Sequence, residues 1–128
     1  ILTWLKQHAE FVQVLHPADP HSAGHQYWKE ICKGGHSAGL VSVIFDSKYE
    51  LQDIRNFCDS LKLFKLGFSW GGPVSLVMLY NLKDMRVLEH SHLKDGLLVR
   101  FCIGLEHPED LIQDIQHALE QMKKLKNE

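Results

Sequence analysis

The chain has 128 residues, of which 45% are hydrophobic, so it is long and apolar enough to fold as one domain with a buried core. Its 14 basic and 16 acidic side chains leave a net charge of −2, which gives no reason to expect nucleic acid or a membrane as a partner. No apolar run approaches the length of a membrane span, and no signal peptide is visible. The three cysteines, Cys32, Cys58 and Cys102, fall on apolar stripes, so we expect reduced core residues in a cytoplasmic protein.

Apolar periodicity predicts four helices and five strands. Helices are expected over residues 1–8 and 24–32, from residue 47, and from residue 108; strands are expected over 11–15, 39–46, 63–68, 74–80 and 97–103, and residues 82–96 are expected to form a surface loop. Because few of the strands follow one another as hairpins, the order favours an α+β domain. We expect a mostly antiparallel sheet of four or five strands, covered by helices on one face. A face left uncovered would be a place for another domain to dock.

Two helices carry clear local signals. Ser47 and Glu50 have the spacing of a capping box, and an inward apolar stripe follows at Leu51, Ile54, Cys58 and Leu61. In the helix predicted over 24–32, the residues at helical spacing are Tyr27, Trp28, Ile31 and Cys32.

The first residues have the character of the middle of a helix. Ile1, Leu2, Trp4 and Leu5 lie on one side, and no capping residue precedes them. We therefore expect a fragment of a longer chain; the alternative is that leader residues have been removed.

The stretch Ser69-Trp70-Gly71-Gly72 is a poor core strand but suits a turn that brings backbone and side chains up against a ligand. Arg100 is the lone charge in the apolar run 97–103, where a guanidinium is costly unless it meets an anion. Together they predict a pocket for a small molecule that bears a carboxylate.

Each of these residues also has a purely structural interpretation. Arg100 could form a structural ion pair, or lie on an edge strand and reach solvent along its stem. Ser69 could form a local serine turn, and Trp70 could be a half-buried packing residue.

Other chemistries have weaker signals. Residues 67–71 match the Gly-x-Ser-x-Gly nucleophile elbow of serine hydrolases, but an apolar run without helical period follows them. The pairs His21/His25 and His90/His92 lack a third ligand at a zinc-site spacing, so no metal is expected. Every lysine has the sequence context of a surface residue, so none is expected to bind a cofactor covalently.

Several runs in order along the chain resemble the C-terminal domain of the trans-sulfuration enzymes that use pyridoxal phosphate. They cover residues 24–29, 61–76, 96–106 and 108–114. Within that family, tryptophan after Ser69 resembles the bacterial cystathionine β-lyases, whereas γ-synthases and γ-lyases more often have leucine there. The sequence departs from the pattern at Val74, where the family commonly has glutamate, and at Phe68, where β-lyases often have tyrosine.

The resemblance implies that residues 1–128 form the small C-terminal domain of a longer chain, whose large domain carries pyridoxal phosphate on a lysine. It implies that Ser69 hydrogen-bonds that lysine as a catalytic residue, that Arg100 grips the substrate α-carboxylate, and that Trp70 and Phe68 lie with them at the substrate.

The implied reaction is β-elimination of cystathionine to homocysteine, pyruvate and ammonia, by an intact homotetramer. The fragment alone would be inactive. A γ-type relative, a methionine γ-lyase and a non-catalytic small-molecule-binding module remain the alternatives.

Overall fold

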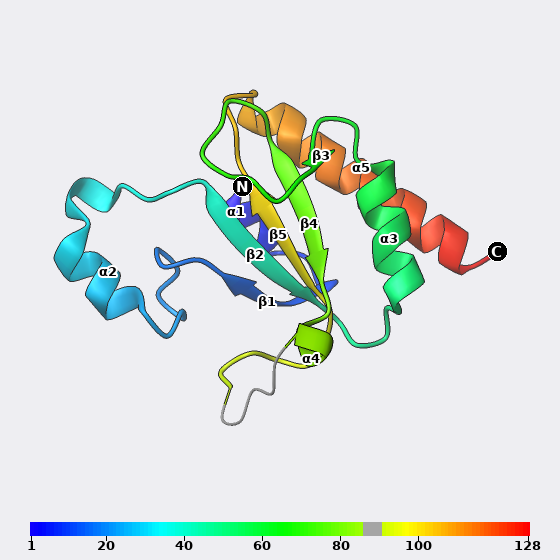
Figure 1. The fold of residues 1–128 in the computed structure, drawn as a ribbon, viewed down its shortest axis with the longest axis horizontal. Helices are drawn as coiled ribbons and strands as arrows, with labels where there is room; N and C mark the ends of the chain where they lie inside the picture. The colour runs from blue at the N-terminus through cyan, green and yellow to red at the C-terminus, as the bar shows by residue number, and fades with distance from the viewer. Residues whose placement is uncertain (86–90) are drawn as a thin grey trace.

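The computed structural model describes residues 1–85 and 91–128, and its centre is a five-stranded sheet (Figure 1). The strands lie in the order β1 (Phe11–Leu15), β2 (Leu40–Phe45), β5 (Leu98–Cys102), β4 (Leu76–Tyr80) and β3 (Lys65–Leu66). β3 pairs with β4 in parallel, and the other three pairings are antiparallel. The helices α3 (Leu51–Ser60) and α5 (Pro108–Lys126) pack together along one face. The predicted α+β class and mostly antiparallel sheet are confirmed.

The core lies between the sheet and these two helices. Alternate residues of the central strands point into it, and Val43, Val99 and Phe101 are fully buried. The ring of Phe101 packs edge to face against Phe57 at 6.3 Å and Phe64 at 5.2 Å between centroids. The helices supply the opposing apolar residues, which are Ile54, Phe57, Leu111, Ile115, Ala118, Leu119 and Met122.

The helix α3 begins later than its sequence predicts. The backbone amide of Glu50 donates to Asp53 at 2.9 Å, so the cap lies at Glu50 and not at Ser47. Ser47 instead lies in a turn closed by Asp46, whose carbonyl accepts from Tyr49 at 2.9 Å. The predicted capping box is therefore wrong. The last helix begins at Pro108, as predicted.

The predicted strand over 63–68 shrinks to the two residues of β3 because a side chain takes its backbone donors. The Asp114 carboxylate accepts the amides of Lys62 at 2.8 Å, Leu63 at 2.8 Å and Phe64 at 3.2 Å. Those amides are then unavailable to a neighbouring strand. The buried carboxylate of α5 thus fixes the path of the chain between α3 and β3.

The N-terminal helices differ from prediction in length and in burial. The helix α1 covers Leu2–Leu5 and is shorter than expected. The helix α2 (His25–Ile31) forms as predicted and precedes the 3-10 turn η1 (Lys33–Gly35), but it buries none of its residues. Tyr27 is 70% and Ile31 77% exposed, and α2 stands apart from α3 and α5 (Figure 1).

Smaller differences concern a loop and the cysteines. The short helix α4 (Leu82–Met85) occupies the start of the predicted surface loop. All three cysteines are free thiols; Cys58 and Cys102 are buried, but Cys32 is half-exposed and not a core residue. Burial raises the pKa of the Cys58 thiol to about 12.

No helix in the described ranges has the length and apolar character needed to cross a membrane.

Candidate functional site

Arg100 and the turn at Ser69 come together on the face of the sheet opposite α3 and α5. The register of β5 places Arg100 between Ser42 of β2 and Met78 of β4. Its Nη2 donates a hydrogen bond to the Phe68 carbonyl at 2.7 Å, and it also lies 3.5 Å from the carbonyl oxygens of Gly67 and Ser69. The guanidinium therefore holds the backbone of the turn that precedes β4.

Two aromatic rings flank the same guanidinium. Its carbon lies 5.9 Å from the centroid of the Trp70 ring and 5.7 Å from that of Tyr80, within the range of cation–π attraction. Arg100 is half-buried, and its Nε is buried with no acceptor among the described residues. Because β5 is the central strand, the edge-strand interpretation of Arg100 is wrong. Within residues 1–85 and 91–128, no carboxylate pairs with Arg100, so the ion-pair interpretation finds no partner there.

The turn presents its side chains outward. Phe68 is 68% and Trp70 65% exposed, Ser69 is exposed, and the Ser69 hydroxyl makes no hydrogen bond to any described residue. A half-buried cation beside an exposed indole and a free hydroxyl can receive a carboxylate and the apolar carbons next to it. The structure thus brings together all four residues singled out in the sequence. Val74, where the family commonly has glutamate, is exposed at the far end of the same turn.

The residues that tie this turn to β5 were not among those predicted for the site. The amide of Gly71, which has a φ of 74°, donates to the buried Cys102 sulfur at 3.3 Å. The Glu106 carboxylate accepts the amide of Ser75 at 2.8 Å and its hydroxyl at 2.7 Å. The Ser75 hydroxyl in turn accepts the amide of Gly104 at 2.8 Å. The available signal was a serine at the head of an apolar strand.

The pKa of Glu106 reflects these contacts. Burial on its own would raise the pKa of the carboxyl, but the hydrogen bonds from the backbone and side chain of Ser75 outweigh burial and hold the pKa below its ordinary value. Glu106 is therefore a charged acceptor, which strengthens both hydrogen bonds.

The structure also places the residues of the serine-hydrolase motif and of the histidine pairs. The Gly-x-Ser-x-Gly run leads into strand β4 instead of the helix that a nucleophile elbow requires. His21 contacts Asp19 at 3.3 Å, whereas His25 contacts the Pro17 carbonyl at 2.9 Å. Among the described residues, no group of three His, Cys, Asp or Glu side chains is placed to hold a metal; His90, of the second predicted pair, lies outside the described residues.

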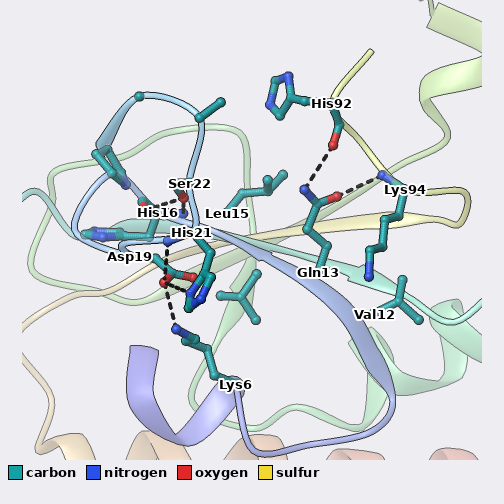
Figure 2. A pocket seen from close by; sticks show the side chains of 14 residues that line it. Lys6, Val12, Gln13, Leu15, His16, Asp19, His21, Ser22, His92 and Lys94 are labelled. Atoms are coloured by element: carbon teal, nitrogen blue, oxygen red, sulfur yellow. Dashed lines mark hydrogen bonds and ion pairs between the residues drawn. The ribbon is translucent and has the colours of Figure 1, made fainter. Parts of the chain in front are cut away.

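A separate hollow of about 640 Å³ lies beside the edge strand β1 (Figure 2). The Gln13 side chain lines it, donating to the His92 carbonyl at 3.1 Å and accepting the Lys94 amide at 2.8 Å. Lys6 and Asp19 form an ion pair at 2.7 Å on its other side. None of the residues predicted for the site lines this hollow, so it is distinct from the turn at Arg100.

Fold and site together define an α+β domain with an exposed turn whose backbone is held by an arginine of the central strand. The family model for Cys/Met metabolism PLP-dependent enzymes matches residues 1–120. The chain therefore belongs to this family of pyridoxal-phosphate-dependent enzymes, as its resemblance to the trans-sulfuration enzymes predicts.

Individual relatives carry different names. An L-alanine/L-glutamate racemase of Wolbachia pipientis is 34% identical over 93% of the chain, and the cystathionine beta-lyase MetC of Escherichia coli is 35% identical over 90%. Among solved structures, a Campylobacter jejuni protein that contains a pyridoxyl-lysine phosphate superposes with a TM-score of 0.73 at 26% identity, covering 93% of this chain and 26% of that one. The chain spans 29% of the length of each of the two curated relatives.

Proposed function

We propose that this chain is the small C-terminal domain of a pyridoxal-phosphate-dependent carbon–sulfur lyase and that it binds the amino-acid substrate. The proposed reaction of the full-length protein is the cleavage of cystathionine to homocysteine, pyruvate and ammonia. Support comes from the family, from the β-lyase named among the relatives, and from the tryptophan at position 70. The proposed partner within the protein is a larger domain, in keeping with the greater length of the relatives.

The observation that carries the proposal is the setting of Arg100. Its Nη2 is held by the Phe68 carbonyl at 2.7 Å, while no described carboxylate neutralises the charge. A half-buried guanidinium without an anionic partner is stabilised most by a carboxylate ligand, whose two oxygens match the geometry of its N–H donors. An amino acid supplies that group.

Pyridoxal phosphate, when bound, supplies the electron sink for breaking bonds at the substrate α-carbon. This chain does not fit the covalent attachment of the cofactor, because each of its lysines is exposed, whereas a lysine that forms such a bond needs a desolvated pocket. We propose that the attachment lies in the larger domain. The residues of this chain then act on the substrate side.

Each residue of the turn has a proposed task. Arg100 fixes the substrate by its carboxylate, and Trp70 covers the apolar part of the substrate and excludes water. The free Ser69 hydroxyl hydrogen-bonds the cofactor lysine of the larger domain. Phe68 contributes apolar surface only, since it lacks the hydroxyl of tyrosine.

Replacement of Arg100 tests the proposal in the full-length enzyme. We expect Arg100→Ala to lower kcat/KM for cystathionine by about 2–4 kcal/mol in transition-state free energy, because a charge-assisted bidentate contact is lost. Arg100→Lys keeps the positive charge but cannot make the bidentate contact, so its kcat/KM should lie between those of the wild type and Arg100→Ala. An unchanged kcat/KM in both variants would refute the carboxylate role.

Product analysis decides the reaction. Pyruvate and homocysteine from cystathionine support the β-lyase, whereas 2-oxobutyrate and cysteine indicate a γ-type relative. The racemase among the relatives gives a specific second candidate. Interconversion of L- and D-alanine without ammonia release would favour it.

We propose further that the full-length protein is a cytoplasmic homotetramer. Light scattering on the purified protein measures its mass. The three free thiols suit a reducing compartment.

A further inference from the structure

We propose that Ser75 and Glu106 are positioning residues that set the place of the Ser69–Trp70 turn relative to Arg100. This inference rests on the proposed function of Arg100 as the carboxylate-binding residue. Neither residue touches the proposed substrate; both act through the turn.

The contacts form a closed clasp between two segments that are 31 residues apart in sequence. The Ser75 side chain, which is fully buried, donates to Glu106 at 2.7 Å and accepts from the Gly104 amide at 2.8 Å. The Ser75 amide donates to the other oxygen of Glu106 at 2.8 Å, and the Leu105 amide donates to the Pro73 carbonyl at 2.9 Å. All the hydrogen bonds of this clasp connect residues 73–75 with residues 104–106.

The approach of the two segments is close enough to exclude a side chain. A Cβ built on Gly104 would lie 2.4 Å from the Pro73 carbonyl oxygen and 2.7 Å from the Ser75 amide nitrogen. Only glycine allows the clasp to close at this position.

The clasp affects the setting of Arg100 because the turn is attached at three places along β5 and the residues that follow it, and the clasp is one of these attachments. The Phe68 carbonyl meets Arg100, the Gly71 amide meets Cys102, and Ser75 meets Gly104. Arg100 and Cys102 are two residues apart on β5, so their side chains project from the same face. Gly104 follows just beyond the end of the strand. The turn therefore lies along the strand that carries Arg100, and its last attachment is the clasp.

The position of Trp70 depends on these backbone attachments because its side chain is 65% exposed and packs against little else. If the clasp opens, the turn loses its anchor at residue 75, and both Trp70 and the Phe68 carbonyl can move away from the guanidinium. A displacement of about 1 Å at a binding group is enough to lower the rate by up to about 100-fold.

The test uses the full-length holoenzyme with the variants Ser75→Ala, Glu106→Ala and Glu106→Gln. The matched control is Glu109→Gln, which makes the same charge change three residues away, where the side chain is 70% exposed and pairs with His107. We expect KM for cystathionine to rise about tenfold in Ser75→Ala and Glu106→Ala, with a smaller change in kcat. Glu106→Gln keeps one acceptor oxygen and should show a smaller rise, and Glu109→Gln should match the wild type.

A second measurement separates positioning from a general loss of folded protein. Glycine, which has no side chain to eliminate, and glycinamide, which lacks the carboxylate, are compared as competitive inhibitors. A mere loss of folded enzyme leaves the ratio of their inhibition constants unchanged. We expect the preference for glycine to fall at least about fivefold in Ser75→Ala and Glu106→Ala.

The outcomes distinguish the two proposals. If Arg100→Ala abolishes the preference for glycine but the clasp variants keep it, the positioning role is wrong and the function of Arg100 stands. If Arg100→Ala also keeps the preference, the carboxylate role itself fails. Should both alanine variants fail to fold, Glu106→Gln decides: a reduced preference for glycine supports the positioning role, and a wild-type ratio overturns it.

Discussion

The two faces of the sheet are stabilised in different ways. On the face under α3 and α5, Val43, Val99 and Phe101 are completely buried and pack against apolar helix residues. On the opposite face, the next residue of the same strand, Arg100, is half-buried and holds a turn by hydrogen bonds to backbone carbonyls. Adjacent residues of one strand thus serve stability on one face and, in the proposed function, recognition of a carboxylate on the other.

This difference has a physical basis. Apolar burial is non-directional and tolerates small shifts, whereas a hydrogen-bonded turn depends on distances and angles. Substitutions under the helices should therefore change the free energy of unfolding, and substitutions on the turn should change binding.

The largest effect on the helix face is expected from Phe101→Ala. Removing a fully buried ring that packs against Phe57 and Phe64 should lower the free energy of unfolding by about 3–5 kcal/mol. Urea denaturation of the protein measures this value. Met78→Ala, on the opposite face beside Arg100, is the comparison and should cost less than half as much. Equal losses in both variants would contradict the difference between the two faces.

A second effect on the helix face concerns a polar residue. Asp114→Ala should lower the free energy of unfolding by about 2–3 kcal/mol, because the amides of Lys62, Leu63 and Phe64 lose their acceptor. Gln113→Ala, exposed on the same helix, serves as the control and should be near neutral. The same urea series compares them, and a neutral Asp114→Ala would show that water replaces the carboxylate without cost.

On the turn, Trp70→Leu should leave the free energy of unfolding nearly unchanged, because the indole is mostly exposed. The variant should weaken substrate binding by about 1 kcal/mol as its contact with the Arg100 guanidinium is lost, or shift the ratio of β- to γ-cleavage. Steady-state kinetics with product analysis detects either change. If KM and products both match the wild type, Trp70 is only a packing residue.

The smallest effect is the acid dependence of stability, which arises from carboxylates that pair with lysines of α5. Burial opposes ionisation of Glu10 and Asp53, but the ammonium groups of Lys123 and Lys126 outweigh it and lower both pKa values. A lowered pKa in the folded state adds stability above the ordinary pKa, which is lost as pH falls through the folded-state value. The free energy of unfolding should therefore decline below about pH 4.

Replacing one of these carboxylates tests the acid dependence. Asp53→Asn should reduce the slope of unfolding free energy against pH in that range, as measured by denaturation at a series of pH values. A slope equal to that of the wild type would assign the acid dependence to other carboxylates, such as Glu106.

Each of the four residues predicted for the site could be found from the sequence because its signal is local. A charge in an apolar strand and a glycine-rich turn are visible in sequence wherever they occur. The clasp was not visible because its partners, Ser75 and Glu106, lie 31 residues apart and neither is unusual alone. The strand over 63–68 was overestimated for the same reason, since Asp114 takes its amides from a distant helix.

The sequence by itself determined the class of fold and the start of the last helix at Pro108. These follow from apolar periodicity and from proline geometry, which are properties of neighbouring residues. Only the tertiary structure decided where α3 begins, that α2 leaves Tyr27 and Ile31 exposed, and how the turn is fastened to β5. Those outcomes depend on which distant groups compete for the same hydrogen-bond donors and apolar surfaces, and that competition is settled only when the chain is folded.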